Sequence, residues 1–256
     1  PVLTGGHTAV SRKERVTEAQ AAFAASLPSW SDTDKKSYIA RHYEAYWLGT
    51  STEKQLKHAR LIASAAPKTV VTQAETDAFT AITEITIYTP DHPRLLALIT
   101  GACAAAGANI AGAQIFTTAD GMALDTILIQ REFQSEDDER RRAERIADLV
   151  RKALRGELWL KEAVARAYRP QQRIKAFTVE PRVIIDNTSS NRFTVIEING
   201  LDRLGLLYDL TEVLYKLNLN IASAHITTFG EKAIDVFYVT DLTGAKIENA
   251  TRHKQI

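Results

Sequence analysis

The chain has 256 residues, of which 45% are hydrophobic and 25% charged, so it can bury the cores of two or three small domains and extended disorder is excluded. Its 32 basic and 31 acidic side chains give a net charge of +1, which argues against nucleic-acid or membrane-surface binding, and no apolar run approaches the roughly 20 residues of a membrane-spanning helix. The single cysteine, Cys103, excludes an internal disulfide framework and indicates a reducing compartment, which we expect to be the cytoplasm.

The first part of the chain, residues 1–68, predicts three short helices. Apolar residues recur at helical spacing in two stretches: Val16, Phe23 and Leu27, then Ile39, Tyr43, Tyr46 and Trp47. A capping box at residues 50–53 predicts the start of the third helix. We interpret the aromatic residues 43–48 as core or domain contact, and Asp32 and Asp34 as the first turn of a helix capped by Ser31 rather than a metal site.

The rest of the chain contains one unit twice. In the first copy, alternating residues 82–88 predict a strand, and a helix from about residue 95 is expected to be capped by Asp91 and ended by Gly107. Strands at 109–117 and 122–130 flank a hairpin turn, a helix starts at Ser135 with its charge run 136–145 facing solvent, and residues 177–185 supply a fourth strand. The sequence therefore predicts the order β-α-β-β-α-β.

The second copy repeats this pattern at a constant offset. Asp91 and Asn109 recur 111 residues later as Asp202 and Asn220, and the copy ends early in its second helix. The predicted fold is α+β: two tandem, ferredoxin-like βαββαβ domains preceded by a small helical segment. We place the boundaries at 1–68 for the helical segment, 69–190 for the first domain and 191–256 for the second, which is truncated at its C-terminus.

Catalytic motifs are missing from the sequence. No pair of histidines has metal-ligand spacing, no phosphate-binding Gly-x-x-x-x-Gly-Lys or nucleophile elbow occurs, and Cys103 lies on an apolar helix face where it should be inert. The βαββαβ order is shared with RNA-recognition modules, but their aromatic strand signature is absent. We expect no catalysis, metal site, cofactor or nucleic-acid binding in this segment.

The turn between the first strand and helix of each copy is the candidate ligand site. Free N–H groups at a helix start attract a carboxylate, and a glycine there lets a ligand approach the backbone. The candidate residues are Asp91, His92, Pro93, Arg94, Leu95, Asn109 and Ile110 in the first copy, and Asp202, Arg203, Leu204, Gly205, Leu206, Asn220 and Ile221 in the second. A capped turn without a ligand is the alternative for each.

These motifs resemble ACT domains, regulatory modules that typically bind amino acids between paired copies. The ordered set of residues 46–48 (YWL), 58–62 (HARLI), 83–93 and 183–187 more specifically resembles the C-terminal region of the bifunctional uridylyltransferase/uridylyl-removing enzymes that act on the PII signal protein. Residues 3–8 resemble the stretch after the hydrolytic HD domain of that family. We therefore expect this chain to be part of a longer protein.

The resemblance implies a regulatory region that senses L-glutamine and itself catalyses nothing. The implied nucleotidyltransferase and HD hydrolase domains, with their divalent metal such as Mg²⁺, their UTP and their PII substrate, precede this region in the family. Glutamine's carboxylate is expected at the amides of Leu95 and Leu96 or of Leu206 and Leu207, with its ammonium at Asp91 or Asp202 and nearby strand carbonyls.

Several alternatives stay open at this point. One is a stand-alone amino-acid-binding ACT regulator, and another is an interaction module without a ligand. The regulatory tail of a guanosine tetraphosphate synthetase would have a single ACT copy. Pairing of the ACT copies within the chain or between two chains of a homodimer is equally open. Arg94, at the position of Gly205, predicts a less open turn in the first copy.

Overall fold

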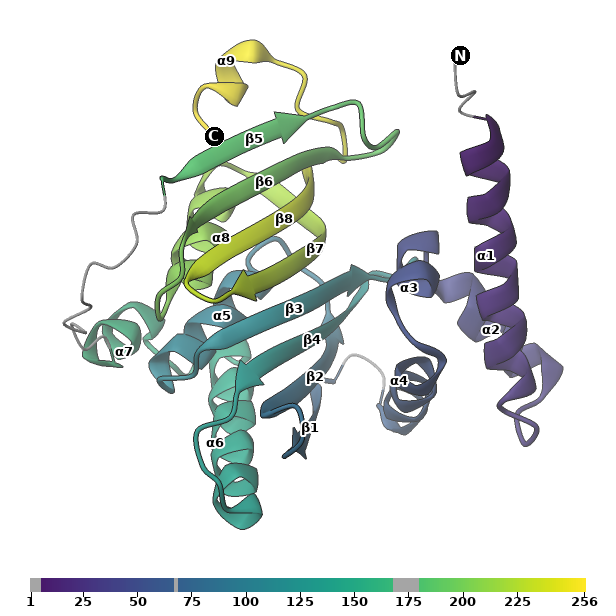
Figure 1. The fold of residues 1–256 in the computed structure, drawn as a ribbon, viewed down its shortest axis with the longest axis horizontal. Coiled ribbons are helices and arrows are strands. Elements are labelled where there is room, and N and C mark those ends of the chain that lie inside the picture. Colours follow the sequence, from purple (N-terminus) through teal and green to yellow (C-terminus); the bar gives the residue numbers. More distant parts are fainter. Residues whose placement is uncertain (1–5, 67–68, 168–179) are drawn as a thin grey trace.

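An antiparallel sheet lies between two layers of helices in a computed structural model that describes residues 6–66, 69–167 and 180–256 (Figure 1). Within those residues the sheet has eight strands in the order β1-β2-β4-β3-β7-β8-β6-β5. The strands are β1 (Val71–Asp77), β2 (Ile82–Pro90), β3 (Ile110–Thr117), β4 (Met122–Gln130), β5 (Arg182–Asp186), β6 (Thr194–Leu201), β7 (Leu219–Phe229) and β8 (Lys232–Asp241). The predicted α+β class with a preceding helical segment is confirmed.

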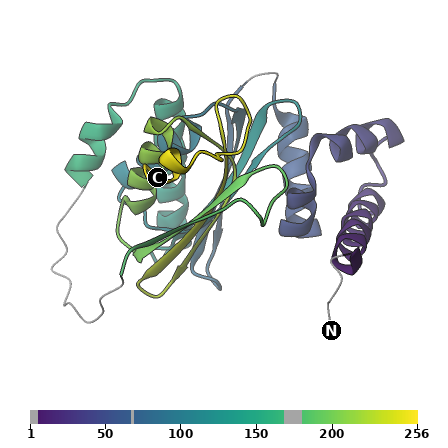
Figure 2. The ribbon, with the colours of Figure 1, turned by 90° about the horizontal axis from the view of Figure 1, so that it is seen from above.

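Helices lie on both sides of the sheet, as the view from above shows (Figure 2). One face carries α5 (Leu95–Ala105), α6 (Glu136–Leu154) and α8 (Leu206–Lys216), with α7 (Leu160–Ala167) packed on α5. The other face carries α1 (Gly6–Ala25), α2 (Asp32–Arg41), α3 (Glu44–Gly49) and α4 (Thr52–Ser64). A last turn of helix, α9 (Ala250–His253), lies near the C-terminus.

The N-terminal helices number four within the described residues 6–66, not the three predicted. The second predicted helix divides because His42 and Tyr43 are extended, which lets the His42 ring stack on Tyr46 with centroids 4.0 Å apart. Tyr46 and Trp47 are buried, so the interpretation of this cluster as core is confirmed. The cap predicted at Ser31 forms, since its side chain accepts from the amide of Asp34. The third predicted helix is capped one residue later than the capping box at 50–53 implies, because Ser51 accepts from the amide of Lys54.

The two copies meet edge to edge through β3 and β7. Gln114 pairs with His225 in the register of these strands, and the hydroxyls of Thr100 in α5 and Thr211 in α8 are 3.1 Å apart. Both pairs join equivalent residues of the two copies, 111 positions apart. An internal two-fold relation therefore runs through the middle of the sheet, and the contact between the copies lies within the chain.

The prediction of a fourth strand for the first copy at residues 177–185 is wrong. Residues 182–186 form β5, which pairs with β6 at the far edge of the sheet, and residues 177–179 lie outside the described part. The position beside β2 is taken by β1 through a hairpin. Each copy thus contains the order β-β-α-β-β, which α6 follows in the first copy and packs on α5 and β1, and the boundary predicted at residue 190 separates two paired strands.

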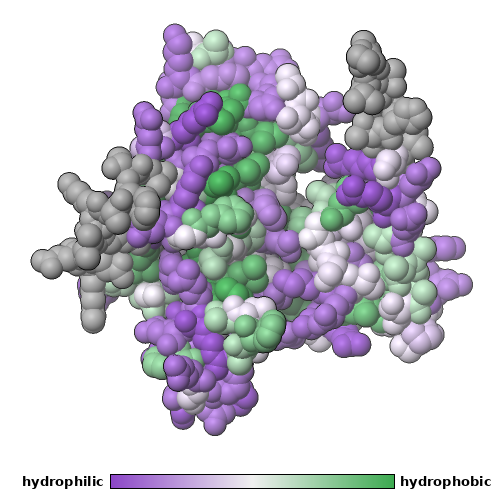
Figure 3. All heavy atoms as spheres, viewed as in Figure 1, coloured by the Kyte–Doolittle hydropathy of each residue, from purple (hydrophilic) through white to green (hydrophobic). Residues whose placement is uncertain are grey.

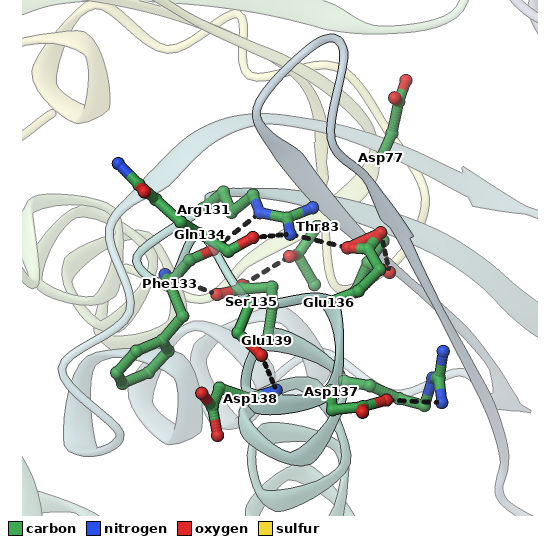
Figure 4. Close-up of polar contacts among 12 residues, drawn as sticks. Asp77, Thr83, Arg131, Phe133, Gln134, Ser135, Glu136, Asp137, Asp138 and Glu139 are labelled. Carbon is green, nitrogen blue, oxygen red and sulfur yellow. Dashed lines mark hydrogen bonds and ion pairs between the residues drawn. The ribbon is translucent and has the colours of Figure 1, made fainter.

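The predicted solvent-facing charge run of α6 contains one buried ion pair. Ser135 caps the helix as predicted, by accepting from the amide of Asp138, and Asp137 is exposed. Glu139 and Arg142, however, are buried and 2.8 Å apart, so the prediction is wrong for these two. Glu139 faces the sheet, where it accepts hydrogen bonds from Thr83 and from the amides of residues 132 and 133 (Figure 4).

Burial by itself raises the pKa of Glu139, but the bonds from Thr83, from the two amides and from Arg142 lower it to about 2. We expect Glu139→Ala to lower the free energy of unfolding by about 3–5 kcal/mol, because it removes the buried charge partner of Arg142, which then keeps only the exposed carboxylate of Glu132. Asp137→Ala, in an exposed ion pair on the same helix, should change it by less than about 0.5 kcal/mol. Urea unfolding at pH 7 compares them. Equal stabilities of the two variants would show that the buried pair of Glu139 and Arg142 does not stabilise the fold.

Candidate functional site

A narrow cleft forms where the second copy's turn meets the first copy's strand. Two groups of predicted residues come together here from different copies: Asp202, Arg203, Gly205 and Leu206 from one, Asn109 and Ile110 from the other. The other lining residues are Thr100, Ala104, Ala108, Leu207, Tyr208, Ile226, Thr228, Ala233 and Asp235. Leu204, Asn220 and Ile221 do not line it. The candidate site is therefore an interface between the copies.

The start of α8 forms one wall of the cleft. Gly205 has a φ of +78°, a conformation that glycine adopts without strain. A Cβ at this position would lie 3.8 Å from the Cβ of Ala104 and 4.0 Å from Cγ1 of Val164 in α7. The amide of Leu206 already donates to the carbonyl of Arg203, and Leu95 donates to His92 in the same way, so these amides are not available as predicted. The first-turn amides of Leu207 and Tyr208 are the remaining anion donors, because such groups have no partner within a helix.

Two carboxyl groups line the cleft, that of Asp202 in the turn before α8 and that of Asp235 on β8. Asp235 on β8 is 2% exposed, and among the described residues its Oδ1 has no hydrogen-bond partner. Burial and then repulsion by Asp202 raise the pKa of Asp235 to about 7. A buried carboxyl without a partner is costly, and a ligand cation would offset that cost. Asp235 was not among the predicted residues, although its recurrence as Asp125 in the first copy was visible in the sequence.

The equivalent place in the first copy is filled by protein side chains. Arg94, which corresponds to Gly205, forms an ion pair of 3.1 Å with Glu212, and its guanidinium lies 5.5 Å from the ring centre of Tyr215. Tyr215 corresponds in turn to Ala104, the small residue that faces Gly205. We call Arg94, Glu212 and Tyr215 the plug. The plug occupies the turn of the first copy, which was predicted to be less open.

The first copy keeps the acidic pair behind the plug. Asp125 is buried, and burial followed by repulsion from Asp91 raises its pKa, although a backbone hydrogen bond from Phe116 acts in the opposite direction. Asp91 accepts from Thr117 at 3.0 Å and does not cap α5, whose N-cap is Arg94. The predicted cap is wrong because α5 starts four residues beyond Asp91. His92 and Pro93 are exposed in the same turn.

The cleft of the second copy is closed in this structure. Its volume is about 20 Å³, which is room for little more than one water molecule. A ligand of the size of an amino acid therefore has to move its walls apart.

Cys103 is buried, and burial raises its pKa to about 12, so the inert role predicted for this thiol fits. In the described residues no group of three or more His, Cys, Asp or Glu could hold a metal ion, and no helix is long and apolar enough to cross a membrane.

Comparison with known proteins finds a domain family that matches part of the chain and relatives that match all of it. Residues 189–255 match the model of the ACR family N-terminal ACT domain. The whole chain is 52% identical to a bifunctional uridylyltransferase/uridylyl-removing enzyme of Rhodopseudomonas palustris and 50% identical to one of Nitrobacter hamburgensis. In both cases the chain spans 28% of the relative's length, at the C-terminal end. A crystal structure of aspartate kinase from Synechocystis aligns with 64% of this chain and 24% of the kinase chain at 17% identity, with a TM-score of 0.33, which is too low to support an argument.

Proposed function

The chain belongs to the bifunctional uridylyltransferase/uridylyl-removing enzyme family, whose C-terminal region it matches throughout, and we propose that it is the glutamine-sensing regulatory region of such an enzyme. The parent enzyme attaches UMP to the PII protein and removes it, in the cytoplasm, through preceding domains that use UTP and a divalent metal such as Mg²⁺. This region regulates the two activities and does not itself catalyse either of them.

The cleft between the copies carries the proposal, because the polar groups that line it complement an amino-acid zwitterion. The carboxyl groups of Asp202 and Asp235 suit the α-ammonium, and the first-turn amides of α8 suit the α-carboxylate. Asn109 and Thr228 supply uncharged polar groups to the same cleft. A neutral amide side chain fits these groups, whereas the carboxylate of glutamate would be repelled by the two acids.

The closed state of the cleft supplies a route to regulation. A ligand that binds only when the walls separate shifts the population toward conformations with an open cleft, and it can bias a distant activity by as much as its affinities for the two states differ. The helices α5 and α8, joined at Thr100 and Thr211, are the elements that such an opening displaces.

Calorimetric titration of this chain with glutamine tests the proposal. We expect binding to wild-type protein, at least about tenfold weaker binding to Asp202→Ala, since a charge-assisted contact is lost, and no detectable heat with glutamate. Asp91→Ala is the matched control, because it removes the equivalent acid behind the plug and should leave the affinity unchanged. A flat glutamine titration of the wild type would refute glutamine sensing and favour an interaction module without a ligand.

The plug predicts one ligand per chain. Replacing it with small residues, as Arg94→Gly, Glu212→Ala and Tyr215→Ala together, should open the first-copy site beside Asp91 and Asp125. We expect the stoichiometry with glutamine to rise from one toward two per chain in the same titration, with the original site keeping its affinity. A stoichiometry that stays at one in a folded triple variant would show that the plug is not what closes this site.

A further inference from the structure

Strand β8 has apolar side chains on both of its faces. Phe237 and Val239 are buried against the helices of the ligand face, whereas Ile234, Val236 and Tyr238 alternate with them and point the other way. The strand register puts Val195 of β6 beside Tyr238. A sheet with one solvated face normally alternates apolar and polar residues, and a strand that is apolar on both faces is typical of a sheet covered on both sides.

The same face of the first copy is in fact covered. Leu124 and Thr126 correspond to Ile234 and Val236, and α3 and α4 bury both of them. His58 reaches Thr126 at 3.4 Å, and the ring of Tyr46 packs edge-on against Phe116 at 5.4 Å. Over the second copy no helix of the described residues lies on this face (Figure 2). We call Val195, Ile234, Val236 and Tyr238 the open sheet face.

A groove runs between the N-terminal helices and the second copy, and Tyr238 is the residue of the open sheet face that lines it. It is lined among others by Arg12 of α1, Tyr43, Arg192, His225 and Tyr238, and its volume is about 800 Å³. Figure 3 shows hydrophobic atoms gathered over the strands of the second copy in the upper part of the view, beside a hollow that separates them from α1. The groove is far larger than the ligand cleft, whose volume is about 20 Å³.

We propose that the open sheet face docks the catalytic part of the enzyme that precedes this chain. The relatives are more than three times as long as the chain, and the part that they have in addition lies before it. That part enters through α1, whose Arg12 forms the outer wall of the groove, so it is tethered beside the face at a high effective concentration.

The position of β8 connects this docking surface to the ligand cleft. Asp235 points into the cleft, and the next residue, Val236, points to the open sheet face. A shift of β8 on ligand binding therefore changes the surface that the catalytic part contacts. This step depends on the proposed glutamine-sensing function, whereas the docking itself does not.

Modification of histidines in the full-length enzyme by diethylpyrocarbonate tests the docking. His225 in the groove and His92 in the turn before α5 are both exposed in this structure. We expect His92 to react and His225 to react at least tenfold more slowly. Equal reactivity of the two would overturn the proposal. Protection of His225 that disappears on dilution to monomers would also overturn it, since a second copy would then cover the face.

Val236→Lys in the full-length enzyme places a charge on the open sheet face, and Val213→Lys, on the exposed side of α8, is its matched control. We expect only Val236→Lys to restore the reactivity of His225 and to abolish the effect of glutamine on both activities. If His225 is protected but glutamine has no effect even in the wild type, the docking stands and the proposed sensing fails. An unchanged His225 reactivity in a folded Val236→Lys variant would contradict the docking.

Discussion

Replacing Gly205 with valine is expected to abolish glutamine binding, with an affinity at least about a hundredfold lower than that of the wild type. The φ of +78° is strained for a β-branched residue, and the new Cβ would face Ala104 at 3.8 Å, so the methyl groups would fill the cleft. Calorimetry gives the affinity, and circular dichroism during urea unfolding shows whether the variant is folded.

The strain needs its own control, because an unfavourable backbone conformation alone costs about 1–3 kcal/mol of stability. Gly156→Val provides it, since Gly156 has a similar φ of +73° and open space around the position of a Cβ. This variant should lose comparable stability and keep its affinity for glutamine. If Gly205→Val binds as well as Gly156→Val, the cleft is not the ligand site.

The affinity for glutamine is expected to increase about tenfold between pH 6 and pH 8, because the carboxyl group of Asp235 has to lose its proton to accept an ammonium group. Its pKa is raised to about 7, mainly by burial and further by Asp202, so most molecules carry the proton at pH 6 and few do at pH 8. Calorimetry in buffers of different ionisation enthalpy should also detect proton release on binding near pH 7. Asp235→Asn should bind weakly and without this pH dependence. The same weak pH dependence in wild type and variant would exclude Asp235 as the ammonium site.

The same carboxyl group predicts the pH dependence of stability without ligand. The pKa is higher in the folded than in the unfolded state, so the folded state holds the proton more tightly. The contribution of Asp235 to stability is therefore greatest below about pH 4, falls as the pH rises and is lowest above about pH 7. Asp235→Asn should gain stability relative to wild type at pH 8 compared with pH 5, as measured by urea unfolding.

The sequence allowed prediction of those parts of the fold that periodicity encodes. The helix and hairpin of each copy, and the caps at Ser31 and Ser135, follow from local patterns and occur in the structure. Strand β1 was missed because its residues 72–77 are mostly polar, as an edge strand allows. The pairing of β5 with β6 was missed because strand partners are chosen by long-range contacts.

The candidate site was only partly predictable for the same reason. The turn at Asp202 and Gly205 was identified from its repetition, but its partner is Asn109 of the other copy, which no pattern within one copy reveals. In the sequence, Asp235 is one polar residue within an apolar strand, and this pattern does not show that its carboxyl group is buried. The ion pair of Arg94 with Glu212, which closes the first site, joins residues 118 positions apart.

A crystal structure of this chain with glutamine would locate the ligand. We expect one glutamine per chain in an opened cleft between the copies, with its ammonium group at Asp202 and Asp235 and its carboxylate at the first-turn amides of α8. Glutamine bound elsewhere, or an unoccupied cleft at saturating glutamine, would contradict it.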